Sequence, residues 1–381
     1  MSRPDHSAAA SVATLASPVG LGRLRLRNRV AVAPMTRVSA SADGLPSARM
    51  ADYYRAFAQG GFGLVITEGL YTDRAHAQGY LHQPGLSDNA QAQAWRALVA
   101  AVRGDGAAMV AQLMHAGALS QGNPHRRHNV APTRLRPAGQ QMAFYRGSGP
   151  YDVPAQITIG QIDEAIAGFA QAARHACEAG FDGVEIHGAN GYLLDQFLTE
   201  GINQRSDRYG GSVRQRLTLI TEVIQAVRAQ VGASFTVGLR ISQGKVNDFG
   251  HKWRGGVDEA ADIFGTLGAL PLDYLHTTEF EAWQPAFDDG GPSLAALATR
   301  HAGLPVIANG GLHDPAQAAG MIARGEAQMV SLGRGALTHA DWPARVAASL
   351  PLQAFDRAML SPIADLDNAD RHLAARTQAP H

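Results

Sequence analysis

Three side chains in one short stretch could together grip a carbonyl oxygen and supply a proton beside it. Residues 187 to 196 read His-Gly-Ala-Asn-Gly-Tyr-Leu-Leu-Asp-Gln and follow an apolar run. His187 and Asn190 are hydrogen-bond donors, and Tyr192 is a phenolic acid two residues later. If a strand ends at His187 and a helix begins near Asn190, all three side chains can project from one corner. The alternative is that His187 is a satisfied buried histidine and Asn190 a helix cap.

Regular elements must position these side chains, and short apolar runs do alternate with longer amphipathic segments along the chain. Apolar residues spaced by three and four share one helix face, whereas short continuous apolar runs are typical of buried strands. The expected strands are Val30–Ala33, Leu64–Thr67, Ala108–Leu113, Gly183–His187, Thr236–Ile241, Asp273–His276, Pro305–Ala308 and Met329–Leu332. The expected helices include Asp88–Val102, Gln161–Glu178, Val213–Val231, Val257–Leu267 and Pro315–Arg324.

Strands that alternate with helices indicate parallel β/α units, and eight units close most naturally into a (β/α)8 TIM barrel. A doubly wound α/β sheet is the alternative. Helix-start signals agree, because Thr158 with Gln161 fits a capping box and Asp314 precedes a proline at a first helical position. A barrel carries its function at the carboxyl ends of its strands. The side chains suited to chemistry follow these ends: Thr36, Glu68, Gln112, His187, Arg240, Asn309 and Arg334.

Glycines near the C-terminus predict a phosphate site. Asn309-Gly310-Gly311 follows the seventh strand, and Gly333-Arg334 follows the eighth. Glycine lets backbone N–H groups approach a phosphate closely, and the arginine adds positive charge. The alternative is a pair of ordinary turns beside a surface arginine. No Gly-x-Gly-x-x-Gly follows a strand and opens a helix, so we expect no separate dinucleotide-binding domain.

Composition excludes several classes of protein. The formal net charge is zero and no long charged run occurs, which argues against a nucleic-acid or anionic-membrane partner. No apolar run is long enough to span a membrane. The single Cys177, expected in the core, excludes an intrachain disulfide framework, and no metal site is expected. These features favour a cytoplasmic protein.

The stretch from His187 to Gln196 and the segment after it resemble the Old Yellow Enzyme family. That segment contributes Asn203, Arg205, Asp207, Tyr209, Gly210, Gly211, Ser212 and Arg216, of which Arg205, Asp207 and Arg216 are expected to form an ion-pair network. The resemblance runs from about Pro18 to Ala348. It implies a TIM barrel that binds FMN non-covalently, takes electrons from NADPH or NADH and reduces the C=C bond of activated alkenes. In that scheme His187 and Asn190 hold the substrate oxygen and Tyr192 donates the proton.

The resemblance also implies which residues contact the flavin. The ring would lie against Ala33, Pro34, Met35, Thr36, Gly69, Gln112 and Arg240, and its phosphate against Asn309, Gly310, Gly311, Gly333 and Arg334. The missing side chain of Gly69 would let the ring lie close. Arg240 is a permanent cation suited to negative charge at the pyrimidine edge, although alone it could equally be a structural ion-pair partner. Three aromatic residues could wall the substrate pocket or simply pack: Tyr80, Phe280 and Trp283.

The expected organisation is a flexible tail over residues 1–17, an FMN-binding barrel over 18–360 and a C-terminal tail over 361–381, as a monomer or homodimer. Residues 114–157 are expected to leave the barrel as a long, lid-like excursion after the third strand. Its basic residues, including Arg126 and Arg127, either form a solvated loop or attract the phosphates of a nicotinamide nucleotide.

Two other functions fit a flavin barrel. One is a dehydrogenase that acts in the oxidative direction on an amine or cyclic substrate, and the other is a flavin-binding sensor without turnover. The triplet of His187, Asn190 and Tyr192 offers donors rather than a base, which favours the reductive reaction.

Overall fold

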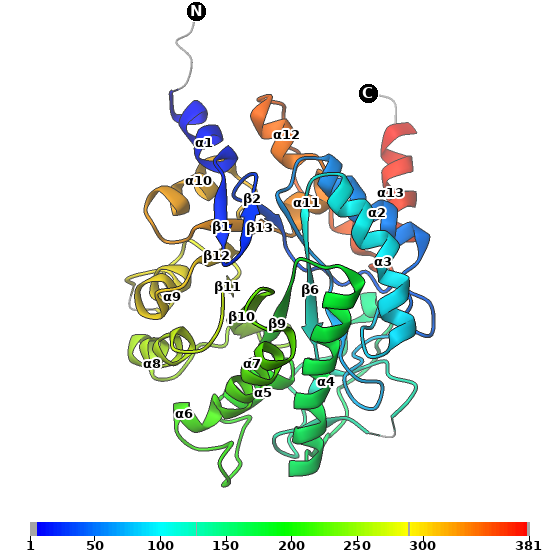
Figure 1. The fold of residues 1–381 in the computed structure, drawn as a ribbon, viewed down its shortest axis with the longest axis vertical. Coiled ribbons are helices and arrows are strands. Elements are labelled where there is room, and N and C mark those ends of the chain that lie inside the picture. Colours follow the sequence, from blue (N-terminus) through cyan, green and yellow to red (C-terminus); the bar gives the residue numbers. More distant parts are fainter. Residues whose placement is uncertain (1–5, 127, 289, 379–381) are drawn as a thin grey trace, which may run out of the picture.

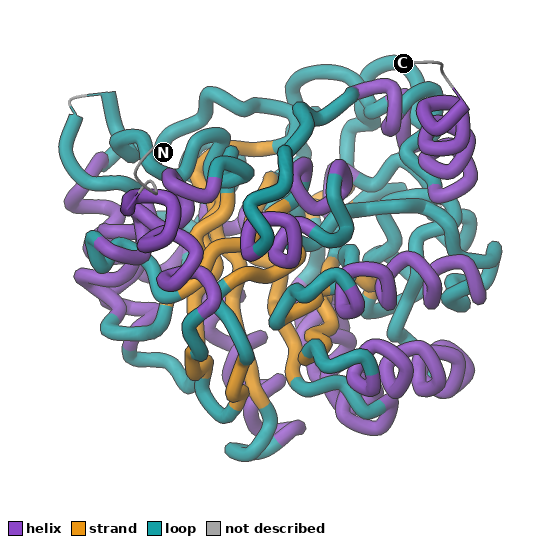
Figure 2. The backbone as a smooth tube through the Cα atoms, turned by 90° about the horizontal axis from the view of Figure 1, so that it is seen from above, coloured by secondary structure: helices purple, strands orange, loops and turns teal. Residues whose placement is uncertain are grey.

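Eight parallel strands close into a barrel in the computed structural model, which describes residues 6–126, 128–288 and 290–378. Their order around the barrel is β4-β3-β13-β12-β11-β10-β9-β6, and β4 pairs with β6 to close the ring. The strands are β3 (Val30–Val32), β4 (Leu64–Ile66), β6 (Ala108–Met114), β9 (Gly183–Asn190), β10 (Thr236–Lys245), β11 (Tyr274–Thr278), β12 (Val306–Asn309) and β13 (Met329–Leu332). The expected (β/α)8 barrel is therefore confirmed, and Figure 2 shows its strands enclosed by helices.

Helices surround the barrel on its outer side (Figure 1). They are α2 (Ala48–Gln59), α3 (Asn89–Gly104), α4 (Ile159–Ala179), α5 (Leu193–Leu198), α6 (Val213–Arg216), α7 (Thr218–Val231), α8 (Gly256–Gly268), α9 (Leu294–Ala302), α10 (Pro315–Ala323), α11 (Arg334–Thr338) and α12 (Trp342–Ala347). The predicted caps are confirmed, since Thr158 and Gln161 form a complete capping box and Asp314 caps α10. The helix expected over Val213–Val231 was wrong as one element, because the chain breaks at Leu217 into α6 and α7.

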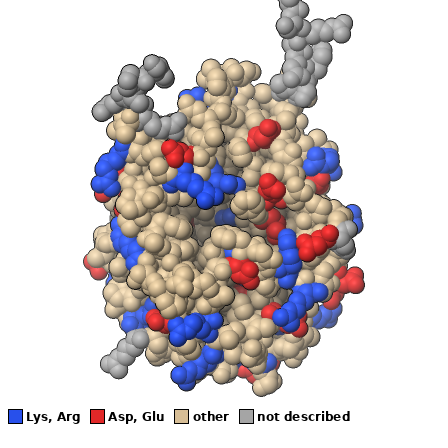
Figure 3. Space-filling view, turned by 180° about the vertical axis from the view of Figure 1, so that it is seen from behind, with Lys and Arg blue, Asp and Glu red and all other residues tan. Residues whose placement is uncertain are grey.

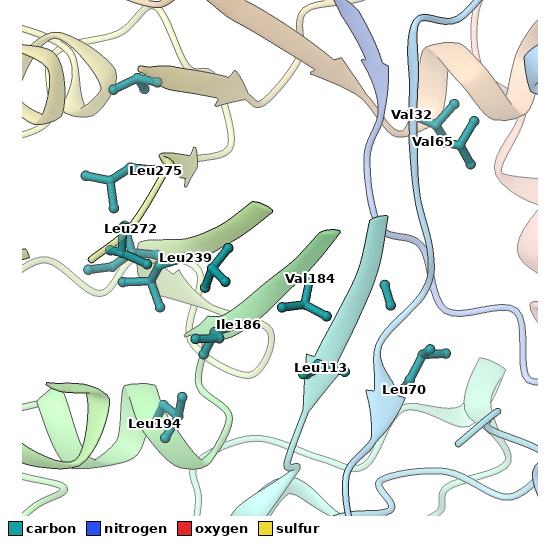
Figure 4. Close-up of a cluster of buried hydrophobic side chains, with 14 of the residues drawn as sticks. Val32, Val65, Leu70, Leu113, Val184, Ile186, Leu194, Leu239, Leu272 and Leu275 are labelled. Atoms are coloured by element: carbon teal, nitrogen blue, oxygen red, sulfur yellow. The ribbon is translucent and has the colours of Figure 1, made fainter. Parts of the chain in front are cut away.

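Alternation along each strand separates the helix-facing core from the barrel interior. On β9, Val184 and Ile186 belong to the large outer cluster, in which side chains of strands and helices pack together (Figure 4). Their neighbours Glu185 and His187 must then face inward, because successive strand residues point to opposite faces. Each fully buried aliphatic side chain contributes about 1.5–3 kcal/mol to stability, so this outer layer fixes the direction in which the polar residues point.

The amino-terminal end of the barrel is closed by an apolar cluster. A hairpin of β1 (Val19–Leu21) and β2 (Leu24–Leu26) places Leu21 and Leu26 there. They pack with inward-facing strand residues such as Leu64, Ile66 and Met329, all nearly inaccessible to solvent. The polar interior residues therefore gather toward the opposite, carboxyl end.

Near both ends of the chain, the described residues form helices where the sequence analysis expected tails. Within the expected flexible tail of residues 1–17, α1 (His6–Ala16) packs against α10 and buries Leu15. Alanine-rich sequence favours a helix, and Leu15 gives it an apolar contact. In place of a C-terminal tail, α13 (Leu366–Gln378) is tied to the barrel through the backbone N–H of Leu366, which donates to Ser39 Oγ at 2.9 Å.

The chain leaves the barrel after β6, at the predicted excursion of residues 114–157. It contains the short turns η1 (Gly117–Leu119) and η2 (Ala143–Tyr145), and its strand β7 (Val130–Ala131) pairs with β8 (Ala155–Gln156). Two shorter elements complete the described chain: β5 (Leu70–Tyr71), which pairs with β6, and η3 (Arg357–Leu360), which precedes α13.

Two smaller expectations were wrong. Cys177 is exposed on α4 instead of buried, because its position falls on the solvent side of an otherwise amphipathic helix. Arg205 does pair with Asp207, but Arg216 pairs with the buried Glu259 of α8, so the three residues are not one network. Within the described residues, no helix combines the length and apolar character needed to cross a bilayer. Figure 3 shows acidic and basic side chains interspersed over a face that is hollowed near its centre.

Candidate active site

The residues singled out in the sequence converge on one cavity of about 380 Å³. They come from the carboxyl ends of six different strands, which only barrel closure brings together. Those that line it are Pro34, Met35, Thr36, Gly69, Gln112, His187, Asn190, Tyr192, Arg240, Gly333 and Arg334. Ala33 stands behind this group, where its backbone N–H donates to Leu332 at 3.0 Å and holds the segment against β13.

A second cavity of about 620 Å³ shares Gly333 and Arg334 with the first. Asn309, Gly310 and Gly311 line it as well, so the predicted phosphate residues lie together. Gly310 and Gly311 have φ of 139° and 64°, a region that favours glycine. A Cβ at Gly310 would come within 2.2 Å of the carbonyl oxygen of Glu279. Glycine is therefore required at that position by the fold itself, and it leaves the backbone open to the cavity.

The corner that carries Asn190 and Tyr192 differs from the expected one. Strand β9 continues through Asn190, and α5 begins only at Leu193. Asn190 and Gly191 both adopt positive φ, 63° and 86°, which turns the chain sharply between strand and helix. The backbone N–H of Asn190 donates to Ser242 Oγ at 2.9 Å, so β10 braces the turn.

A buried ion pair locks this corner, and the sequence analysis missed it. Lys245 Nζ donates to Asp195 Oδ1 at 2.8 Å, with both side chains at most 2% exposed. Asp195 Oδ2 in turn accepts from the backbone N–H of Gly191 at 2.5 Å. A carboxylate at the start of α5 thus ties the turn to the end of β10. Charged residues in sequence suggest surface, and only the position of Asp195 in the apolar stretch Leu193–Leu198 could have indicated burial.

His187 is neutral at physiological pH. Burial, reinforced by the nearby positive charge of Arg240, lowers its pKa to about 3. A neutral imidazole has one N–H donor and one acceptor nitrogen. Nδ1 of His187 is buried without a hydrogen-bond partner among the described residues, and the ring lies 5.1 Å from that of Tyr192. The imidazole can therefore offer a hydrogen bond to a ligand oxygen without bringing a charge into the cavity.

Tyr192 is paired with a second tyrosine, Tyr80. Their hydroxyl oxygens lie 2.5 Å apart, and burial raises the pKa of both phenols. Tyr80 is fully buried and does not line the cavity. The expectation that Tyr80 walls the substrate pocket was therefore wrong, because the phenol of Tyr192 stands between Tyr80 and the cavity. Of the two phenols, Tyr192 is the one that lines the cavity.

The other two aromatic candidates lie nearer the phosphate glycines. Phe280 is 66% exposed, and the guanidinium of Arg334 lies 5.5 Å from its ring centre. Trp283 packs behind Gly311, where an added Cβ would come within 3.0 Å of the indole. Neither residue lines the cavity that holds His187 and Tyr192. Phe280 lines the second cavity and also a third one that contains Asn190, so contact of Phe280 or Trp283 with a substrate stays a prediction.

The excursion of residues 114–157 contributes side chains that the sequence analysis did not identify. Met142, Phe144 and Tyr145 line the first cavity. The hydroxyl of Tyr145 donates to the backbone oxygen of Thr36 at 3.4 Å, and its ring lies 4.7 Å from that of Tyr80. This segment therefore covers the end of the cavity beside Thr36.

Two basic residues of the excursion make structural contacts. Arg126 donates from Nη2 to the backbone oxygen of Ser120 at 3.1 Å, and it does not line either cavity. Arg146 pairs with Asp365 at 2.9 Å, which joins the excursion to the C-terminal segment. Arg127 lies outside the described residues. The structure thus gives no support to a role for Arg126 in attracting phosphates.

Gln112 and Arg240 form the polar floor of the first cavity. Burial lowers the pKa of Arg240 to about 10, which still leaves the guanidinium positively charged at neutral pH. Its Nη2 donates to Asn309 Oδ1 at 2.8 Å, and its buried Nε has no partner within the described chain. Asn309 therefore acts through its side chain on Arg240. Gly69 lines the same cavity, and a Cβ there would meet Met114 Sδ at 2.5 Å, so packing alone already favours a glycine at this position.

Comparison with known proteins places this site in context. The family model described as NADH:flavin oxidoreductase / NADH oxidase matches residues 14–353. The chain is 35% identical to 12-oxophytodienoate reductase 1 from Oryza sativa subsp. japonica, over 93% of this chain and 91% of the relative. An Old Yellow Enzyme homologue from Zymomonas mobilis superimposes with a TM-score of 0.82 at 28% identity, covering 93% and 98% of the two chains. Morphinone reductase in complex with tetrahydroNAD superimposes at 0.80, with 31% identity over 91% and 93%.

Proposed function

Since the chain belongs to the NADH:flavin oxidoreductase / NADH oxidase family, which includes the Old Yellow Enzymes, we propose that it is an FMN-dependent ene-reductase. It would take electrons from NADPH or NADH and reduce the C=C bond of an alkene conjugated to a carbonyl or nitro group. The relatives named above support this class, because one is a reductase of 12-oxophytodienoate and another binds tetrahydroNAD.

The chemistry of the two cavities fits FMN. The pyrimidine edge of a flavin needs both donors and acceptors, and Gln112 and Arg240 supply them on the floor of the first cavity. The buried Nε of Arg240, unpaired within the described chain, is a donor that such an edge would satisfy. The phosphate needs backbone N–H groups and a cation, which Gly311, Gly333 and Arg334 offer in the adjoining cavity.

The side chains around the first cavity can then divide the reaction between them. Bound FMN would supply the redox chemistry by accepting electrons from the nicotinamide and passing them to the alkene. His187 and Asn190 would hold the carbonyl or nitro oxygen, on which negative charge grows in the transition state. Donors fixed in advance stabilise that charge more than they stabilise the bound substrate. Tyr192 would donate its phenolic proton to the α-carbon.

The lid-like excursion of residues 114–157 would cover the open side of the first cavity. Met142 and Tyr145 cover the cavity beside Thr36 and would exclude water from the reacting atoms. We therefore assign residues 114–157 to closure of the site. We assign the loops after β10 and β11, which carry the exposed Phe249 and Phe280, to its mouth.

The single observation that carries the proposal is the cavity shared by Gln112, Arg240, His187, Asn190 and Tyr192. Anaerobic stopped-flow at the flavin absorbance band tests it, with NADPH added first and 2-cyclohexen-1-one second. Bleaching followed by recovery is the expected result. Bleaching without recovery would overturn the alkene as substrate and favour a dehydrogenase, and a protein that cannot bind FMN would overturn the flavin itself.

A further inference from the structure

A chain of buried polar residues lies inside the barrel beneath the floor of the first cavity. Gln112 Nε2 donates to Glu185 Oε1 at 2.8 Å, and Glu185 Oε2 contacts His276 Nδ1 at 2.8 Å. The chain ends where His276 Nε2 meets Ser331 Oγ, also at 2.8 Å. Every member is at most 2% exposed, and together they bridge β6, β9, β11 and β13. Of these residues only Gln112 reaches the cavity.

The positions of the protons follow from Glu185 being ionised. Burial alone would raise the pKa of this carboxyl, but His276, Arg240 and Gln112 outweigh it and the pKa is lowered. A carboxylate only accepts hydrogen bonds, so His276 must carry its proton on Nδ1. Burial lowers the pKa of His276, which leaves Nε2 as an acceptor for the hydroxyl of Ser331. The hydroxyl of Tyr274 also donates to Glu185 Oε2, at 3.1 Å.

The same reasoning fixes the amide of Gln112. Because the carboxylate can only accept, the nitrogen of the amide must face Glu185 and its oxygen must face the other way. The cavity therefore receives a carbonyl oxygen and one remaining N–H. This is an acceptor beside a donor, the pattern complementary to an N–H next to a carbonyl on a heterocycle edge.

We propose that Glu185 is a positioning residue that holds Gln112 in its flavin-binding orientation and sets the flavin potential with a buried negative charge. The inference rests on the proposed binding of FMN in this cavity. It extends that proposal to a residue that does not touch the cavity. The charge opposes Arg240, the cation on the same floor. A fixed negative charge beneath the pyrimidine disfavours the added electrons, because buried charges interact strongly in a poorly solvated interior.

Substitution Glu185→Gln tests both parts, since it removes the charge and keeps the shape. The midpoint potential of bound FMN, measured by dye equilibration, is expected to become more positive. The Kd for FMN, measured by fluorescence quenching on titration of the apoprotein, is expected to rise about tenfold for the loss of one charge-assisted hydrogen bond. Ser331→Ala is the matched control, because it cuts the far end of the chain and leaves charge and Gln112 intact; both quantities should stay near wild type.

A second variant separates position from charge. Glu185→Asp keeps the charge but withdraws the carboxylate from Gln112, so the Kd should rise while the potential stays nearly constant. The double variant Glu185→Asp with Gln112→Leu should bind FMN no more weakly than Gln112→Leu alone. If Glu185 acts through Gln112, the effects of the two substitutions on the Kd are not additive. An unchanged potential and Kd in Glu185→Gln would overturn the inference, as would an unchanged Kd in Glu185→Asp should Glu185→Gln not fold. Failure of the wild-type apoprotein to bind FMN would instead overturn the proposed function.

Discussion

The hydroxyl oxygens of Tyr80 and Tyr192 lie 2.5 Å apart, yet only Tyr192 lines the cavity. When Tyr192 gives up its proton, its oxygen becomes a strong acceptor and Tyr80 is in place to donate to it. The hydrogen bond therefore lowers the pKa of Tyr192 against the larger effect of burial. We therefore predict that Tyr80 makes Tyr192 a better acid in the proposed reaction.

Replacing Tyr80 should slow only the half-reaction with the alkene. For Tyr80→Phe we expect a loss of about three- to tenfold, the worth of one neutral hydrogen bond, while reduction of the flavin by NADPH keeps its rate. Stopped-flow of each half-reaction measures both. Tyr151→Phe is the matched control, since Tyr151 lies in the same cluster and its buried hydroxyl has no partner among the described residues. Equal losses in the two variants would remove Tyr80 from this role.

Removal of the acid itself should have a larger effect on the same step. Tyr192→Phe is expected to slow the alkene half-reaction by about a hundredfold or more, the usual contribution of a general acid. Flavin reduction should be spared, because no proton from Tyr192 is needed there. A comparable loss in both half-reactions would contradict the assignment of Tyr192 as proton donor.

The buried, neutral His187 makes stability depend on acid. Its pKa of about 3 in the folded chain lies below the usual value of about 6.5, so acid protonates the unfolded chain first. The contribution of the neutral imidazole to the free energy of unfolding is fully present above about pH 6.5 and is lost as the pH falls toward 3. At pH 5 the loss is about 2 kcal/mol. His187→Gln should reduce the difference in unfolding free energy between pH 7 and pH 5 by that amount. Substituting the exposed His125 by Gln should leave the difference unchanged.

Arg334 should bind the phosphate of the flavin rather than its ring. Arg334→Ala is expected to raise the Kd for FMN about tenfold or more, since it removes a charge-assisted contact. Binding of riboflavin, which has no phosphate, should change little. Arg324→Ala is a suitable control, because Arg324 is exposed and pairs with Glu326 away from both cavities. A parallel loss of FMN and riboflavin affinity would place Arg334 elsewhere in the site.

The buried pair of Lys245 and Asp195 should be essential to stability. Lys245→Met leaves the carboxylate of Asp195 buried without its cation, which costs about 3–5 kcal/mol. Lys252→Met is the comparison, since Lys252 pairs with Glu279 at 3.2 Å while a third of its side chain is exposed; such pairs contribute less than about 1 kcal/mol. Urea unfolding distinguishes the two, and similar losses would argue against a special role for the buried pair.

The strands were predictable because parallel strands are buried on both faces and appear as continuous apolar runs. The errors lie at their carboxyl ends. Strands β9 and β10 continue to Asn190 and Lys245, where polar residues follow the apolar ones and conceal the pairing. The polar residues of the site therefore interrupt the apolar pattern of a buried strand at the carboxyl ends of β9 and β10.

Most residues that face the cavity were predictable, and the residues that support them were not. The motif around His187 carries its own chemistry, whereas Glu185 and His276 are ionisable side chains that sequence reasoning assigns to solvent. Alternation was the available signal, since Glu185 stands between two buried aliphatic residues on β9. The contact between Tyr80 and Tyr192 spans 112 positions, and a single sequence gives no means of pairing them.

The apolar cluster that contains Leu21 and Leu26 closes the amino-terminal end of the barrel, so that end gives no passage to a ligand. Whatever enters the first cavity therefore cannot leave through the amino-terminal end of the barrel and must leave on the carboxyl side, where it entered. An electron donor and an electron acceptor of similar size would then compete for the same floor area, and an excess of either would delay the other. The rate of turnover would then depend on how fast the two ligands enter and leave the cavity as well as on the reacting groups. The exposed loops after β10 and β11 would therefore influence the rate as much as the selectivity.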